Sequence, residues 1–170
     1  MSKAFTKEDV GPAEGIVVRP RAPLPTEEPN YVTARGLSLL QEELRALEAE
    51  RVTLDASTDE DQRARLPALQ SRIDDVAARI HGLVLVDSSS HPADEVRFGA
   101  HVTVKDQTGR ERRYQIVGVD EANGAEGRLA FVAPVARALL GRKVGDVTQV
   151  QTPRGEEELE VMAVSYDPAG

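Results

Sequence analysis

The sequence predicts an α+β protein, in which an antiparallel helical hairpin precedes an antiparallel β domain with one short helix. In the first half, apolar residues recur at alternating three- and four-residue steps, which places them on one seam of each of two helices. A short acidic loop separates the two seams, so the second helix must turn back along the first. From about residue 96 onwards, apolar and polar residues alternate with the period of two that is typical of strands.

The amino-acid composition excludes several classes of function and several kinds of site. The 170 residues carry a formal net charge of -8, which argues against sequence-specific nucleic-acid binding through a broad basic face. The absence of cysteine excludes disulfides and thiolate metal sites, and the three histidines show no ligand spacing. Because no apolar run is long enough to span a bilayer and the start lacks a signal-peptide core, we expect a cytoplasmic protein without membrane contact.

The first 30 residues predict a disordered or extended tail, because they are rich in proline and show no sustained apolar period. Two interpretations stay open for residues 1–30: a solvated tail with no role of its own, or an arm that binds a partner. The prolines of this segment are Pro12, Pro20, Pro23, Pro25 and Pro29.

The hairpin is predicted over residues 31–83. Thr33 is the expected N-cap of a first helix over 34–54. Arg51 takes an expected apolar position, where it either loosens the seam or turns outward to pair with a carboxylate at the tip. The first seam consists of Leu37, Leu40, Leu44, Leu47 and Leu54, and the second of Leu66, Leu69, Ile73, Val76, Ile80 and Leu83.

The start of the second helix is open to two interpretations. Ser57 and Glu60 have the spacing of a capping box, which would place Pro67 inside the helix as a kink. Alternatively, the regular helix begins near Leu66 with Pro67 in its first turn. The helix is expected to end near Gly82 in a left-handed cap. The loop at the tip carries four carboxylates, Asp55, Asp59, Glu60 and Asp61.

A linker over residues 84–95 is expected to lead into a C-terminal domain over 96–167. This domain should contain about five strands, with a turn at 106–109 between the first two. A short helix is expected over 134–140, because Pro134 suits its first position and Gly141 follows its end.

Four segments resemble the Gre-type (GreA/GreB) transcription elongation factor family. They are 31–36 (YVTARG), 98–104 (FGAHVTV), 114–121 (YQIVGVDE) and 134–146 (PVARALLGRKVGD), of which the last is the most specific. The resemblance extends from about Tyr31 to Tyr166. It implies a C-terminal domain with an FKBP-like fold that docks at the rim of the RNA polymerase secondary channel, and a coiled coil that enters the channel with its tip towards the active site.

In cleavage factors of this family, tip carboxylates help to hold the second catalytic magnesium, and the polymerase hydrolyses its own backtracked transcript. The resemblance transfers such a role at most to Asp59 and Glu60, as ligands of a magnesium ion that the polymerase holds. The resemblance implies that the chain has no cofactor of its own, and that it is not an enzyme but at most a stimulator of the polymerase's hydrolytic activity.

Two departures from the family favour a different function. The tip lacks the Glu-Asn-Ala pattern of cleavage factors. The hairpin is also roughly 16 residues shorter than in full-length members, which removes on the order of 12 Å of reach, and shortened relatives such as the Rnk proteins provide a precedent. We therefore predict a regulator that enters the channel without strong transcript cleavage. The alternative is a transcript cleavage factor, and a third interpretation of the tip carboxylates is an ordinary solvated turn.

The predicted surface for RNA polymerase lies on the C-terminal domain and consists of Asp120, Glu121, Pro134, Val135, Ala136 and Arg137. Two other function classes were considered. A peptidyl-prolyl isomerase needs an aromatic-lined pocket, but aromatic residues make up only 4% of the chain. A self-associating coiled-coil module needs free apolar surface, whereas pairing of the two seams within the chain predicts a monomer.

Overall fold

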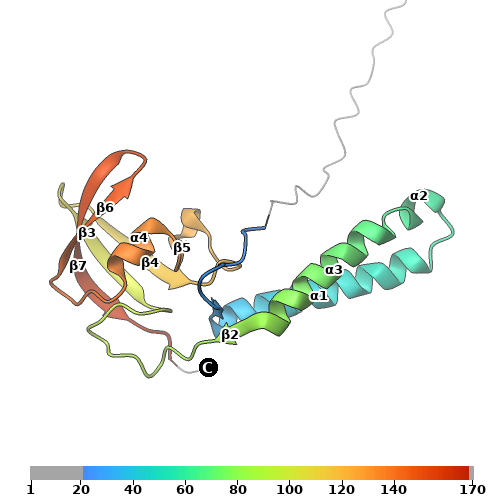
Figure 1. Ribbon diagram of the computed structural model, residues 1–170, viewed down its shortest axis with the longest axis horizontal. Helices are drawn as coiled ribbons and strands as arrows, with labels where there is room; N and C mark the ends of the chain where they lie inside the picture. The colour runs from blue at the N-terminus through green and yellow to red at the C-terminus, as the bar shows by residue number, and fades with distance from the viewer. Residues whose placement is uncertain (1–20, 169–170) are drawn as a thin grey trace, which may run out of the picture.

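The computed structural model describes residues 21–168, and it consists of a helical hairpin that projects from a β domain (Figure 1). The mixed α+β class predicted from the sequence is confirmed. The residues 1–20 of the predicted tail lie outside the described residues. Within 21–168, no helix combines the length and the apolarity that crossing a membrane requires.

The hairpin is built from two long helices, α1 (Ala34–Asp55) and α3 (Leu66–Gly82), with the short helix α2 (Glu60–Arg63) at the tip. Thr33 caps α1 as predicted, since its side chain accepts a hydrogen bond from the Gly36 N–H. The two long helices pack through the predicted seams. The buried seam residues are Leu40, Leu47, Leu54, Leu69, Ile73 and Val76.

Both ends of α3 resolve questions that the sequence raised. Pro67 lies in the first turn of α3, where a missing N–H leaves no helical bond unmade, so the second of the two interpretations is confirmed. The left-handed cap at Gly82 is wrong, because Gly82 has no positive φ and Leu83 continues the chain in extended conformation.

Leu83 begins a small parallel ladder that the sequence did not predict. Strand β2 (Leu83–Leu85) pairs with β1 (Asn30–Val32), so the segment before α1 and the segment after α3 are joined at the base of the hairpin. Residues 84 and 85 of the predicted linker, and residue 30 of the predicted tail, therefore belong to strands.

The C-terminal sheet has the strand order β5-β4-β3-β7-β6. The expected turn at 106–109 connects β3 to β4. The prediction of a wholly antiparallel sheet is wrong, because β5 pairs with β4 in parallel after a crossover that includes a short 3-10 helix, η1 (Gly124–Glu126). The strands are β3 (His101–Asp106), β4 (Glu111–Val117), β5 (Arg128–Ala130), β6 (Val147–Thr152) and β7 (Gly155–Ser165).

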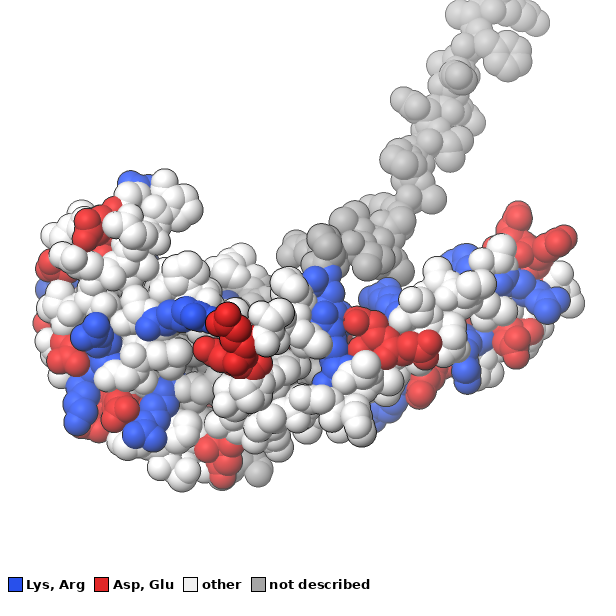
Figure 2. Space-filling view, in the orientation of Figure 1, with Lys and Arg blue, Asp and Glu red and all other residues white. Residues whose placement is uncertain are grey.

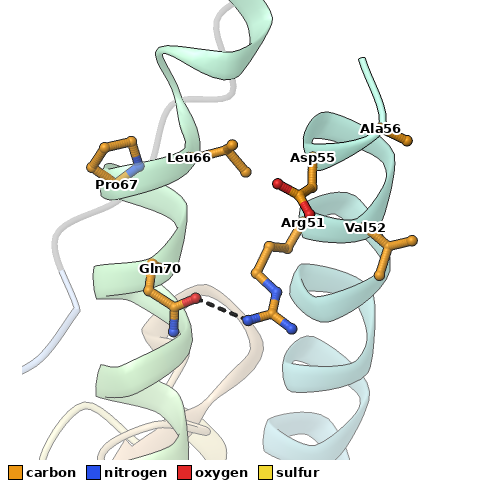
Figure 3. Close-up of a pocket in the computed structure, with 7 residues that line it drawn as sticks. All are labelled: Arg51, Val52, Asp55, Ala56, Leu66, Pro67 and Gln70. Atoms are coloured by element: carbon orange, nitrogen blue, oxygen red, sulfur yellow. Dashed lines mark hydrogen bonds between the residues drawn. The ribbon is translucent and has the colours of Figure 1, made fainter.

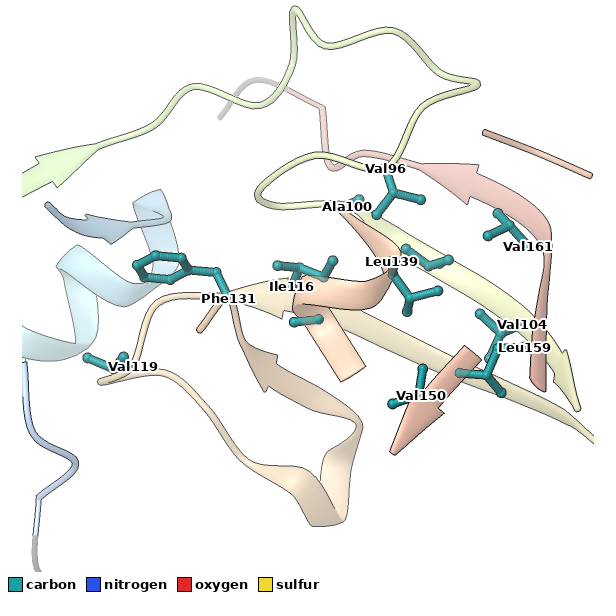
Figure 4. Close-up of a cluster of buried hydrophobic side chains, with 12 residues drawn as sticks. Val96, Ala100, Val104, Ile116, Val119, Phe131, Leu139, Val150, Leu159 and Val161 are labelled. Carbon is teal, nitrogen blue, oxygen red and sulfur yellow. The ribbon is translucent and has the colours of Figure 1, made fainter. Parts of the chain in front are cut away.

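Helix α4 (Pro134–Leu139) covers one face of this sheet and closes the core (Figure 4). Gly141 adopts φ 80° just past the helix, the left-handed conformation that glycine tolerates best. The core is separate from the hairpin seam, so each part has its own apolar packing. Its residues are Val96, Ala100, Val102, Val104, Ile116, Val119, Phe131, Ala136, Leu139, Val150, Leu159 and Val161.

Candidate functional site

The base of the hairpin is fastened to the C-terminal domain by two neighbouring carboxylates in the loop after β4. The first, Asp120, accepts a hydrogen bond of 2.8 Å from Nη1 of Arg79, which lies in the last turn of α3. The two side chains are only 4% and 7% exposed. A buried pair of this kind is hard to break on one side, since the remaining charge would have no partner.

The second carboxylate, Glu121, holds the other helix. The hydroxyl of Thr33 donates a 2.5 Å hydrogen bond to Oε2 of Glu121, and Arg35 lies 3.6 Å from Oε1. The carboxylate therefore sits beside the N-terminus of α1, where the helix dipole favours negative charge. Gly36 makes this approach possible, because a Cβ there would lie 2.9 Å from the carboxylate oxygen.

A third contact at the base brings backbone against backbone. A Cβ at Gly118 would lie 2.4 Å from the carbonyl oxygen of Tyr31 in β1. The Tyr31 ring packs edge-on against Phe131 with centroids 5.5 Å apart, and Phe98 lies 6.0 Å away. The base of the hairpin is thus a closely packed joint rather than a free linker.

The tip of the hairpin has the opposite character, because all four of its predicted carboxylates are exposed. Asp59 is the N-cap of α2, where its Oδ1 accepts a hydrogen bond from the Asp61 N–H. Glu60 and Asp61 follow in the first turn of that helix. Figure 2 shows acidic side chains gathered at this far end. These features agree with the expected solvated turn with ordinary capping, since Asp59 caps α2 and Glu60 and Asp61 lie where the helix dipole favours negative charge.

An open groove lies between the long helices just below the tip (Figure 3). Arg51 reaches across it, and its Nη1 donates a 3.1 Å hydrogen bond to the side-chain oxygen of Gln70. The partner of Arg51 is thus an amide of the opposite helix, so the predicted pairing with a tip carboxylate is wrong. Val52, Asp55, Ala56, Leu66 and Pro67 complete the lining.

The described residues hold no group of three or more histidine, aspartate or glutamate side chains that could bind a metal ion. Asp59 and Glu60, the two predicted ligands, are neighbours at the tip. One Asp59 oxygen is occupied by its capping bond. The chain can thus offer part of a magnesium shell at this point, and the remaining ligands would have to come from a partner.

Comparison with known proteins identifies the family. Residues 91–166 match the model of the C-terminal domain of the transcription elongation factors GreA and GreB. GreB of Neisseria meningitidis serogroup B is 33% identical over 157 residues, which cover 83% of this chain and 96% of that protein. The chain belongs to the GreA/GreB transcription elongation factor family. The resemblance inferred from the sequence is confirmed.

Other GreA/GreB proteins match over different extents. GreA of Acidiphilium cryptum is 34% identical over 79% of this chain and 96% of the relative. With GreA of Thioalkalivibrio sulfidiphilus, the identity is 39%, but the match covers 58% of this chain and 63% of that relative. Among solved structures, GreA factor homolog 1 of Thermus thermophilus aligns with 81% of this chain and 99% of its own at 24% identity, with a TM-score of 0.40.

Of the docking residues that the sequence predicted for this GreA/GreB family member, some are buried in the structure and others are exposed. The side chains of Asp120 and Glu121 are 4% and 1% exposed, so their predicted place on an exposed surface is wrong. Ala136 is fully buried in the core and cannot face a partner either. Pro134 and Arg137 are exposed on α4, and Val135 is half-buried between them.

Sequence reasoning missed the residues that make the base of this Gre-family hairpin rigid, above all Arg79. A charged residue beside an apolar seam is usually solvated, and nothing local reveals that Arg79 meets Asp120, which lies 41 residues further on. Gly36 did offer a signal. A glycine in the first turns of a helix weakens it by about 0.5–1 kcal/mol relative to alanine, so its presence hints at a close approach.

Proposed function

We propose that this chain is a regulator that binds bacterial RNA polymerase, docks at the secondary channel through its C-terminal domain, and inserts the hairpin with its acidic tip foremost. The observation that carries this proposal is a hairpin of GreA/GreB type whose tip exposes all four carboxylates. The hairpin points away from the C-terminal domain, so the two can contact different parts of one partner (Figure 1).

Within this proposal, the chain divides into a coiled coil at 31–83, a connection at 84–95 and an FKBP-like domain at 96–167. The seam supports the coiled coil, since residues from both long helices alternate along it. The C-terminal sheet with one short helix across it supports the assignment of an FKBP-like domain. We further propose that the free protein is a monomer, because each seam already has its partner within the chain.

The proposed docking surface is the exposed part of the predicted one. It centres on Pro134 and Arg137 of α4, with Val135 between them. Arg137 is 55% exposed, and within the described part of the chain it forms an ion pair with Glu28 at 3.7 Å, so the guanidinium is accessible to an acidic surface. Asp120 and Glu121 contribute indirectly, because they hold the hairpin in its direction.

We propose that the tip acts without strong transcript cleavage. Helix α1 has 22 residues and is therefore about 33 Å long. The match to Neisseria GreB spans 157 positions, whereas 83% of 170 residues is about 141, so about 16 positions of the match have no counterpart in this chain. We propose that these positions are absent from the hairpin, which would make it shorter than in GreB. Metal coordination tolerates no gap of several ångströms, since ligand distances are about 2 Å.

The alternative function is a transcript cleavage factor. In that case, Asp59 and Glu60 would add oxygen ligands to a magnesium ion held by the polymerase, which would supply charge stabilisation for hydrolysis. The chain itself would orient these carboxylates through the capping bond of Asp59. Under either function the chain is no enzyme of its own, and it brings no cofactor.

Binding to the polymerase is tested by a pull-down of core RNA polymerase at low salt, followed by competition with a GreA protein. We expect retention of the polymerase and its displacement by GreA, because both proteins would use one site. Absence of binding to core polymerase would overturn the proposal. The double variant Pro134→Ala and Arg137→Glu should weaken binding, whereas the exposed control Arg154→Glu on the β6–β7 turn should not.

The two functions are separated by a transcript cleavage assay on a stalled, backtracked complex. It compares the wild type with a variant in which all four tip carboxylates, Asp55, Asp59, Glu60 and Asp61, are changed to alanine. We expect neither protein to raise cleavage above the rate of polymerase alone. Strong stimulation by the wild type that is lost in the variant would establish the cleavage factor instead.

A further inference from the structure

The segment that precedes β1 crosses the junction between the hairpin and the C-terminal domain (Figure 1). Its first described residue, Arg21, contacts a carboxylate from each of three elements. Its guanidinium lies 2.5 Å from Glu43 on α1, 3.7 Å from Asp75 on α3 and 3.2 Å from Asp120 in the domain. Residues 21–29 thus form an extended segment with defined contacts, within the stretch that the sequence predicted to be a disordered or extended tail.

The geometry of Arg21 suits a guanidinium better than any other side chain. Five N–H donors in a rigid fork can serve several carboxylates at once, which a lysine ammonium on a flexible stem does less well. The Arg21 side chain is 24% exposed. Burial by itself would lower the pKa of Arg21, but the hydrogen bond to Glu43 and the charges of Asp120 and Asp75 raise it overall.

Two further contacts fix the course of this segment. Nη2 of Arg79 donates a 3.0 Å hydrogen bond to the carbonyl oxygen of Ala22, so the buried Arg79–Asp120 pair also holds the segment. At the other end, Glu28 lies 3.7 Å from Arg137 on α4. The segment is thus attached to the hairpin at its start and to the C-terminal domain near its end.

We propose that residues 21–29 form an intramolecular strap, and that Arg21 is the residue through which the strap fixes the direction of the hairpin relative to the C-terminal domain. The two carboxylates at the base hold one helix each, Glu121 through Thr33 and Asp120 through Arg79. Arg21 contacts carboxylates of α1, α3 and the domain together. Without it, the hairpin turns about its base while both parts stay folded. This inference concerns the free chain and does not depend on binding to polymerase.

The absence of cysteine makes the test direct, because two introduced cysteines are the only labelling sites. Thr58→Cys at the tip and Gln151→Cys on β6 place spin labels on exposed positions in the two parts. The distance distribution between the labels is then measured by pulsed electron paramagnetic resonance in three proteins: the labelled chain without further change, the labelled chain with Arg21→Gln, and the labelled chain with Arg45→Gln. Arg45 is an exposed arginine of α1 whose side chain donates a hydrogen bond to the Gln41 carbonyl of the same helix, so it controls for loss of charge.

The labelled chain and the Arg45→Gln control should each give one narrow distance population. Arg21→Gln should give a broadened or shifted distribution, while its circular dichroism stays that of the wild type. The variant Glu43→Gln removes the shortest Arg21 contact from the other side, and it should broaden the distribution in the same way. Superimposable distributions for Arg21→Gln and Arg45→Gln would overturn the proposal.

Discussion

Acidic residues lie at both ends of the hairpin, but in opposite settings. At the base, Asp120 and Glu121 are buried and hydrogen-bonded, whereas at the tip Asp55, Glu60 and Asp61 are exposed. A buried carboxylate is held by its partners and stabilises one arrangement of the parts. An exposed carboxylate adds little to stability, so it remains available to another molecule. The comparison separates the acidic residues that shape the protein from those that we propose to act on the polymerase.

The largest effect is expected at the base. Asp120→Ala leaves Arg79 buried without its main partner, and breaking a buried pair on one side costs about 3–5 kcal/mol of unfolding free energy. Denaturant unfolding followed by circular dichroism measures this loss. The tip variant Asp61→Ala should change the free energy by less than about 0.5 kcal/mol. Equal effects of the two variants would remove the distinction between base and tip.

The close approach at the base gives the next effect. Gly118→Ala forces a Cβ against the Tyr31 carbonyl, and overpacking of this kind costs about 1–3 kcal/mol. Gly82→Ala is the matched control, because a Cβ at that position would meet no atom within 4 Å apart from its chain neighbours and the backbone of its own helix. The same unfolding experiment should show a loss for Gly118→Ala and none for Gly82→Ala. A Gly118→Ala variant with unchanged unfolding free energy would mean that β1 does not contact the domain closely at Gly118.

At the tip, the capping residue should matter more than its neighbours. Asp59→Ala removes the acceptor for the Asp61 N–H, and losing an N-cap costs about 0.5–2 kcal/mol of helix stability. Because α2 has only 4 residues, we expect faster amide exchange in α2 rather than a lower stability of the whole chain. Glu60→Ala leaves this capping bond in place and should leave exchange unchanged. Exchange that is equally fast in both variants would contradict the capping role.

The smallest effect concerns a carboxylate of the sheet domain that resembles neither end. The hydroxyl of Thr108 donates to Asp106 at 2.5 Å, and this bond, with those from the Arg110 and Thr108 N–H groups, lowers the pKa of Asp106 although burial opposes the shift. A lowered pKa in the folded state stabilises the protein above the unfolded value of about 3.9. The stabilisation is lost as the pH falls through the lower folded value.

This pKa is measured by following the Asp106 carboxyl carbon by NMR during an acid titration. Thr108→Val should move the midpoint upwards, because it removes the hydroxyl donor. A midpoint that Thr108→Val leaves in place would show that the turn does not bind the carboxylate.

The elements predicted correctly are those set by local sequence. Thr33 followed by a seam of leucines defines α1, and Pro134 with Gly141 brackets α4, because caps and helical periodicity depend on neighbours within a few residues. The β1–β2 ladder escaped prediction because each strand has three residues and the two lie about 50 residues apart in the chain. Its pairing depends on closure of the hairpin.

In the candidate site too, features that depend on local sequence were predicted and features that depend on distant residues were not. The tip carboxylates were located correctly, since exposure is the ordinary state of charged residues in a polar loop. The burial of Asp120 and Glu121 could not be predicted, because it depends on Arg79 and Thr33, which lie 41 and 88 residues earlier in the sequence than their respective partners. The same holds for Arg21, whose three partners are distant from it and from one another along the chain.

The most direct test of the contrast between base and tip is transcription by RNA polymerase titrated with the protein. Three forms are compared at equal occupancy of the polymerase: the wild type, the alanine variant of all four tip carboxylates, and a control with four other exposed carboxylates changed to alanine. The control residues are Glu42, Glu48, Glu156 and Glu158. We expect the wild type and the control to change transcript yield equally, and the tip variant to bind without changing it. A tip variant that is as effective as the wild type would contradict the account.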